Sequence, residues 1–191
     1  MANTFSRNLD WVYYKLILVS DVYPDIIFPE EDGVTYEENA IIKAESAYKD
    51  LKNKKLLKEN DIVFGDDTGL EVKEMPEELG LYTARFLGEE TPQSERNKEV
   101  VKRLNEGNKD RSAKFICTIA YIENGITKVV KGLVEGSISK NVDEGINGFG
   151  YDPIFIAKEY NKPFSSCTTL EKIKISHRGK AFSKMIKALG G

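Results

Sequence analysis

Two adjacent acids, Asp66 and Asp67, follow a short apolar stretch at residues 62–64, and Thr68 and Gly69 come directly after them. Neighbouring carboxylates repel each other, which costs stability unless a cation lies beside them. Because side chains alternate along an extended strand, we expect only one of the two acids to face a given cleft. Two acids, a hydroxyl and a glycine fit the handling of a metal ion and water, although an ordinary Asp-rich turn has the same composition.

A second cluster lies near the C-terminus, where Ser176 has the position of a helix N-cap. Apolar residues recur behind it at helical spacing: Ala181, Phe182, Met185, Ile186 and Leu189. The first turn of this helix would carry His177, Arg178 and Lys180, although the helix dipole favours negative charge at that end. The arrangement fits the docking of an anion, most simply phosphate. A solvated basic turn is an equally weighted alternative.

A glycine-rich segment at residues 145–153 contains two aromatic residues and three glycines. Such a backbone can approach a flat ligand closely, with Phe149 or Tyr151 as the stacking face. The glycine spacing is not that of a dinucleotide-binding fingerprint. On this segment alone, a glycine-rich turn with aromatic residues in the core is the favoured interpretation.

An acidic run at residues 30–32 precedes a segment with the capping-box pattern, Thr35 followed three residues later by Glu38. Asn39 and Lys43 are four residues apart, so they share one face of the helix that begins here. Glu38 has either a role in the site or a purely structural role in the capping box. The acidic run itself is most often a solvated loop.

Composition excludes several classes of function. The net charge of −3 argues against a general nucleic-acid binder, and no apolar run is long enough to span a membrane. The first residues do not resemble a secretory signal, and two isolated cysteines suit a reducing cytoplasm. The single histidine excludes a multi-histidine metal site, so a metal would be held mainly by oxygen, as Mg²⁺ or Mn²⁺ is.

Both strands and helices must position these residues. We expect strands at residues 2–5, 26–28, 62–64, 113–122, 128–138 and 153–156, with a hairpin turn at 123–125. We expect helices at residues 9–20, from 35 onward, at 95–104, and two near the C-terminus. This mixture indicates an α/β or α+β sheet protein, and 191 residues fit one domain, with room for two lobes.

Taken together, the motifs resemble the inosine triphosphate pyrophosphatases, which hydrolyse deaminated purine nucleoside triphosphates. The resemblance rests on ordered segments over roughly residues 30 to 190: residues 37–40 with Lys43, 66–70, 80–86, 148–155, 171–172 and 176–178. It implies a single domain over residues 1–191, an elongated two-lobed α/β protein. Helices would flank its long central mixed β-sheet, and a cleft between the lobes would hold the active site. It also implies a homodimer and a nucleoside triphosphate substrate.

The resemblance also implies roles for individual residues. Asp67 matches the general base that activates water, assisted by Asp66 and Mg²⁺, and Glu30 or Glu31 matches a further metal carboxylate. The implied substrate contacts are Ser6, Arg7, Asn8, Lys43, Thr68, Phe149, Gly150, Tyr151, Asp152, Lys172, His177 and Arg178. In-line hydrolysis of a triphosphate needs charge neutralisation and one oriented water, which this set of side chains could supply.

The N-terminal segment departs from the family's phosphate-binding loop, Ser/Thr-Gly-Asn-x-x-Lys. Ser6 and Asn8 are retained, but Arg7 stands where glycine is usual and Trp11 where lysine is usual. Arg7 could supply the missing charge, or Lys15 could reach back by one helical turn. This departure keeps open a second hypothesis, a weakened or non-catalytic nucleotide-binding relative. A third is a pyrophosphatase that acts on modified pyrimidine nucleotides.

Overall fold

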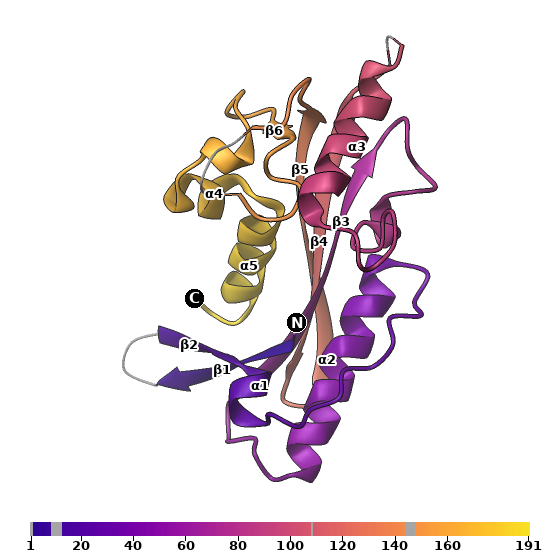
Figure 1. The fold of residues 1–191 in the computed structure, drawn as a ribbon. Helices are drawn as coiled ribbons and strands as arrows, with labels where there is room; N and C mark the ends of the chain where they lie inside the picture. Colours follow the sequence, from indigo (N-terminus) through magenta and orange to yellow (C-terminus); the bar gives the residue numbers. More distant parts are fainter. Residues whose placement is uncertain (1, 9–12, 108, 144–147) are drawn as a thin grey trace. The chain divides into compact units, whose positions relative to one another are not determined.

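The computed structural model describes residues 2–8, 13–107, 109–143 and 148–191, with side chains from residue 14 onward. Six strands form one sheet in the order β2-β1-β3-β4-β5-β6 (Figure 1). The strands are β1 (Ala2–Asn8), β2 (Tyr13–Leu18), β3 (Ile62–Val72), β4 (Ser112–Glu123), β5 (Ile126–Ile138) and β6 (Phe155–Ala157). β1 pairs antiparallel with β2 and β3, and β5 pairs antiparallel with β6.

Helices accompany the sheet, so the predicted class of α/β protein with a long central sheet flanked by helices is confirmed. They are α1 (Val19–Val22), α2 (Tyr36–Asn53), α3 (Gln93–Asn105), α4 (Thr169–Ile175) and α5 (His177–Ala188), with short 3₁₀ turns η1 (Gly80–Tyr82) and η2 (Phe164–Ser166). In the described ranges, no helix combines the length and the apolar character of a transmembrane span.

The chain forms two compact units, each with its own core. Unit 1 consists of Met1–Asp67, Cys117–Lys131 and Ala181–Gly191, and unit 2 of Thr68–Ile116 and Gly132–Lys180. In unit 1, Phe64, Ile119 and Met185 are buried together. The core of unit 2 contains Phe115 and Phe155 among other buried apolar residues. The strands β3, β4 and β5 each contribute residues to both units.

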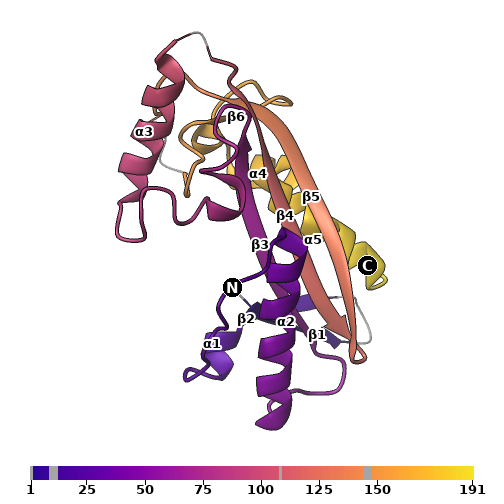
Figure 2. The same ribbon diagram turned by 90° about the vertical axis from the view of Figure 1, so that its right-hand side faces the viewer.

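Local sequence signals explain the best-predicted elements. Thr35 caps α2 by accepting a hydrogen bond from the Glu38 amide, and the helix buries a stripe at helical spacing: Ala40, Ala44, Ala47 and Leu51. The strands β4 and β5 form a long hairpin (Figure 2). Its turn contains Asn124 (φ 52°) and Gly125 (φ 76°), and positive φ at both positions is what a tight hairpin turn requires.

Three expectations about the elements were wrong. The helix predicted over residues 9–20 is contradicted at 13–18, which form β2; aromatic and β-branched side chains such as Tyr14 and Ile17 suit a strand. Residues 26–28 lie in irregular structure, where Ile27 is exposed rather than packed in a sheet. The strand predicted at 62–64 continues to Val72, so residues 65–69 lie within β3 instead of forming a turn after it.

Candidate active site

The position of Asp67 depends on a close approach between β3 and α2, both of which belong to unit 1 at this point. A Cβ atom on Gly65 would lie 2.9 Å from the Ala44 backbone nitrogen and 2.9 Å from Lys43 Cβ. Only glycine allows this spacing without displacement of a neighbour. Residues two apart share one face of a strand, so Asp67 faces the same helix as Gly65.

Two α2 side chains contact the Asp67 carboxylate. Lys43 Nζ lies 2.9 Å from Oδ1, and Asn39 Nδ2 donates to Oδ2 at 3.4 Å. Asn39 and Lys43 lie one helical turn apart, and both are buried, as is Asp67. The predicted shared helix face of Asn39 and Lys43 is therefore confirmed. Charge-assisted hydrogen bonds of this kind hold a carboxylate in one orientation.

Lys43 contacts a second carboxylate, because Glu31 Oε2 lies 3.3 Å from its Nζ. The Gly33 backbone N–H donates to Asn39 Oδ1 at 2.8 Å, which ties the acidic loop to α2. Glu38 Oε2 accepts from the Val34 N–H at 2.7 Å, so the Glu38 side chain holds the segment that leads into α2. Thus the structure brings Glu31, Lys43 and Asp67 together; Glu30 and Glu31 are both exposed, but Glu31 is the one that contacts Lys43.

The residues predicted to bind a metal do not form a complete site in the protein alone. Asp66 is half-buried, consistent with the alternation along β3 that turns only Asp67 toward α2. Within the described ranges, no three His, Cys, Asp or Glu side chains group closely enough to hold a metal ion. Magnesium ordinarily takes only one or two carboxylates and completes its shell with water and substrate phosphates. The carboxylates of Asp67 and Glu31 fit that kind of partial donor set.

In unit 2, residues 149–152 form a tightly held turn. The Phe149 N–H donates to Asp152 Oδ2 at 2.9 Å, and the Asp152 N–H donates to the Phe149 carbonyl at 3.1 Å. Gly150 has φ +60°, a backbone conformation that favours glycine. Lys172 Nζ lies 2.5 Å from Asp152 Oδ2. The turn therefore presents a fixed backbone, and its carboxylate is paired with a lysine from α4.

Phe149 is the aromatic ring that this turn presents to solvent, with 73% of the residue exposed. The guanidinium carbon of Arg178 lies 6.0 Å from its ring centroid. Tyr151, by contrast, is buried in the core of unit 2, and its hydroxyl donates to the Thr83 carbonyl at 3.0 Å. Burial raises the pKa of Tyr151 to about 12, so the phenol stays a neutral donor. Of the two candidate stacking residues, only Phe149 is available to a flat ligand.

His177 begins α5 as predicted, with Ser176 capping the helix by accepting a hydrogen bond from the Gly179 N–H at 3.1 Å. The imidazole stacks on Phe115 at a centroid distance of 4.5 Å and is only 5% exposed. Burial, and secondarily the charges of Arg178 and Lys172, lower the pKa of His177 to about 3. Neither ring nitrogen has a hydrogen-bond partner among the described residues. Both nitrogens are also covered by protein atoms, so the exposed donor at the start of α5 is the neighbouring Arg178 guanidinium.

The structure adds one residue to this region that no sequence motif indicated. Asn97, on α3, is 3% exposed, and its Nδ2 donates to the Gly150 carbonyl at 3.0 Å. The contact joins residues 53 positions apart. The only signal in the sequence is an asparagine on the apolar face of an amphipathic helix, which gives no indication of its partner.

The predicted phosphate-binding residues Ser6, Arg7 and Asn8 lie in β1, opposite Lys15, Tyr14 and Tyr13 of β2. They therefore do not begin a helix, and Lys15 cannot reach back by a helical turn. Trp11 lies outside the described residues. Thr68 is half-buried in β3, directly after Asp67.

Comparisons with known proteins place the chain in a family. The model of the Ham1 family matches residues 8–188, and the chain belongs to that family, which confirms the resemblance predicted from the motifs. Over 158 residues it is 42% identical to the dITP/XTP pyrophosphatase of Bacillus licheniformis, covering 82% of this chain and 76% of the relative.

Two solved structures are similar as well. The Staphylococcus aureus Ham1 protein has a TM-score of 0.77 and 38% identity, covering 91% of this chain and 85% of that one. The nucleoside-triphosphatase, or dITP/XTP pyrophosphatase, of Mycobacterium abscessus has a TM-score of 0.63 and 32% identity, covering 87% and 84%.

Proposed function

We propose that this protein hydrolyses deaminated purine nucleoside triphosphates (ITP, dITP and XTP) to the monophosphate and pyrophosphate, and so cleanses the nucleotide pool. The observation that carries the proposal is the buried Asp67 carboxylate, held by Lys43 and Asn39. Relatives of the same family, matched over most of the chain, are named dITP/XTP pyrophosphatases.

In this reaction water attacks the α-phosphorus, the bond to the bridging oxygen of the β-phosphate breaks, and pyrophosphate leaves. Asp67 takes the proton of the attacking water, and its two α2 partners fix the carboxylate in advance, so that little reorganisation is needed. Lys43 places a positive charge beside the Asp67 carboxylate, and this charge stabilises the negative charge that develops on the phosphates.

Glu30, Glu31, Asp66 and Asp67 are the residues proposed to hold Mg²⁺ or Mn²⁺; Glu31 and Asp67 are favoured because both contact Lys43, whereas alternation along β3 turns Asp66 away from α2. Such an ion, when bound with substrate, neutralises phosphate charge and lets adjacent carboxylates remain ionised. Lys43 already compensates Glu31 and Asp67 in the protein alone. The site is thus built to hold its acids together before the substrate arrives.

A group of side chains in unit 2 is proposed to recognise the base: Phe149, Asp152, Lys172, His177 and Arg178. Phe149 offers a stacking face, and the His177–Arg178 pair at the start of α5 is proposed to contact the base, with the exposed Arg178 guanidinium as the donor to the 6-keto oxygen of hypoxanthine or xanthine. Adenine has an amine at that position, which would leave such a donor unpaired and bind less well. Lys172 and Asp152 complete the proposed contacts. We further propose a cytoplasmic homodimer.

The experiment that tests the proposal is product identification. Incubation of the protein with ITP and Mg²⁺ should release IMP and pyrophosphate in equal amounts, and exhaustive chelation should abolish the reaction. Release of orthophosphate would contradict the proposed bond cleavage, and full activity after chelation would contradict the metal.

A weakened or non-catalytic nucleotide-binding relative is the second candidate, and the placement of residues 6–8 in β1 favours it. If Arg7 supplies the missing phosphate contact, Arg7→Ala should raise KM or lower kcat severely. If the contact is simply absent, Trp11→Lys should improve one of these constants instead. Nucleotide binding without pyrophosphate release would establish this second candidate.

A further inference from the structure

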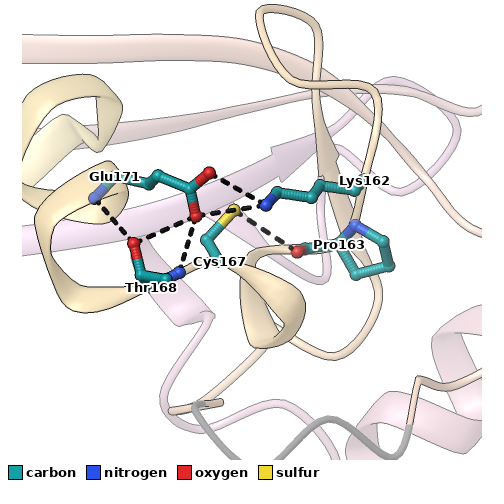
Figure 3. A network of polar contacts seen from close by, with 5 residues as sticks. All are labelled: Lys162, Pro163, Cys167, Thr168 and Glu171. Carbon is teal, nitrogen blue, oxygen red and sulfur yellow. Dashed lines mark hydrogen bonds and ion pairs between the residues drawn. The ribbon is translucent and has the colours of Figure 1, made fainter.

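Glu171 is the centre of a polar network at the start of α4 (Figure 3). Its carboxylate accepts hydrogen bonds from the Thr168 backbone N–H at 2.7 Å and from the Thr168 hydroxyl at 3.1 Å. In return, Thr168 Oγ1 accepts from the Glu171 N–H at 3.3 Å. Lys162 Nζ contacts both carboxylate oxygens, at 3.0 and 3.1 Å. Glu171 therefore combines a capping box with an ion pair to a preceding loop.

This network decides where a very short helix begins. The helix α4 has only seven residues, too few to be stable in isolation, so its first turn depends on contacts from outside. Lys172 comes directly after Glu171, at the beginning of the last turn, and its ammonium group contacts the Asp152 carboxylate. A shift of the first turn would therefore move Lys172 relative to Asp152.

The far end of α4 is held just as closely. A Cβ atom on Gly179 would lie 1.9 Å from the Ile173 carbonyl oxygen, so the start of α5 packs directly on α4. Ser176 lies between the two helices: its N–H donates to the Lys172 carbonyl at 2.8 Å. Because α4 is clamped to α5, its position also affects the helix that carries His177 and Arg178.

The loop that supplies the lysine is itself anchored. Phe164 is fully buried in the core of unit 2, two residues after Lys162. The Cys167 thiol donates to the Pro163 carbonyl at 3.6 Å, and burial raises the pKa of that thiol (Figure 3). Lys162 and Thr168 thus stand at the two ends of a short, well-packed turn. They meet on one carboxylate, that of Glu171.

We propose that Lys162 and Glu171 are positioning residues, which hold Lys172 against Asp152 and thereby set the affinity of the site for its nucleotide. Neither residue needs to touch the substrate in this scheme. The inference rests on the proposed function, because the affinity in question is that for a nucleoside triphosphate. It goes beyond that function by assigning a role to a loop lysine that carries no family motif.

A double-mutant cycle tests the pairing. Lys162→Met removes the ion pair and leaves the capping box intact. Glu171→Gln also removes the ion pair, while glutamine can still cap the helix. Each variant should raise KM for ITP by about threefold to tenfold with kcat nearly unchanged, because a half-exposed ion pair contributes modestly. KM for ITP in the double variant should be no higher than in the more impaired single variant, since both changes remove the same interaction.

Lys73→Met is the matched control. Lys73 forms an exposed ion pair with Asp110 at 2.6 Å in the same unit, so its removal deletes the same charge and the same kind of contact. KM should be unchanged in this control, and the thermal midpoints of all three single variants should stay close together. An unchanged KM in Lys162→Met and Glu171→Gln, or strictly additive effects in the double variant, would overturn the inference.

A second measurement does not depend on activity. Brief treatment with an amine-acetylating reagent, followed by mass spectrometry, reports how well each lysine is protected. Lys172 should react faster in Lys162→Met and Glu171→Gln than in the wild-type protein, and at the wild-type rate in Lys73→Met. Equal Lys172 reactivity in all four proteins would contradict the positioning role. Absence of pyrophosphate release by the wild-type protein would instead contradict the proposed function, whatever the labelling shows.

Discussion

The ion pair between Lys43 and Asp67, 2.9 Å from Nζ to Oδ1, depends on a glycine two residues before the acid. Gly65 lets β3 approach the backbone of α2, which carries Lys43. Both partners of the pair are buried, so each needs the other to offset the cost of desolvation. The ion pair between Lys43 and Asp67 consequently depends on the absence of a side chain at Gly65.

Asp67→Asn should abolish most of the turnover while the protein stays folded, because Glu31 remains as a charged partner for Lys43. Asparagine keeps the size of the side chain but cannot take a proton from water, and a positioned general base contributes roughly 10²–10⁴-fold. We expect kcat to fall by about a hundredfold or more. Asp61→Asn is the control, since the Asp61 carboxylate accepts a hydrogen bond from the Lys58 N–H at the end of a loop. Near-normal turnover in Asp67→Asn would remove this acid from the mechanism.

Gly65→Ala should impair both stability and activity. The new methyl group would lie within 2.9 Å of two α2 atoms, so the strand and the helix must separate. Overpacking of this kind costs about 1–3 kcal/mol in the free energy of unfolding, which denaturant titration can measure. Because Lys43 moves with α2, kcat for ITP should fall as well. A variant with wild-type stability and kcat would show that the close approach has no role.

Phe149→Ala should weaken substrate binding without loss of stability. The ring is 73% exposed, so its removal costs the folded state little. Stacking of a base on an aromatic ring is worth about 1–3 kcal/mol, which predicts a KM for ITP raised at least about fivefold. Leu133→Ala is a control for loss of exposed apolar surface, since Leu133 is 43% exposed on β5. Equal KM values in the two variants would exclude Phe149 as the stacking face.

His177 should make the protein less stable as the pH falls below neutrality. Its pKa is lowered to about 3 in the folded state from an ordinary value of 6.5, so the unfolded chain binds the proton first. The contribution of neutral His177 to the free energy of unfolding is therefore fully present above pH 6.5. It is lost as the pH falls toward 3, at no more than about 1.4 kcal/mol per pH unit. Arg178 and Lys172 add to the lowering of the pKa.

The variant His177→Phe tests this dependence. The replacement keeps a planar ring against Phe115 but cannot titrate. Free energies of unfolding measured between about pH 7 and pH 4 should fall more steeply for the wild-type protein than for the variant. Parallel profiles would mean that His177 does not titrate as a buried group.

Local signals in the sequence predicted the parts of the site that depend on neighbouring residues. The Thr35 cap and the four-residue spacing of Asn39 and Lys43 predicted one helix face, because helical periodicity is a local property. Ser176 before His177 and Arg178 likewise predicted the start of α5. The β4–β5 hairpin followed from its turn residues.

Long-range contacts could not be predicted in this way. Residues 13–18 combine apolar and aromatic side chains that suit a helix or a strand, and pairing with β1 decides the outcome. The need for Gly65 arises only when α2 packs on β3, and the Asn97 contact crosses 53 residues of chain. Burial of Tyr151 and exposure of Phe149 likewise depend on tertiary packing.

Base selectivity is the most direct test of the central claim, that a site with the exposed Phe149 ring and the Arg178 guanidinium beside it favours 6-keto purines. We expect kcat/KM for ITP and XTP to exceed that for ATP and GTP by at least about tenfold, since one good base contact is worth on the order of 1–3 kcal/mol. The measurement is a steady-state comparison of these four nucleotides with pyrophosphate as the detected product. Equal values for all four would contradict the account and leave a general triphosphate hydrolase.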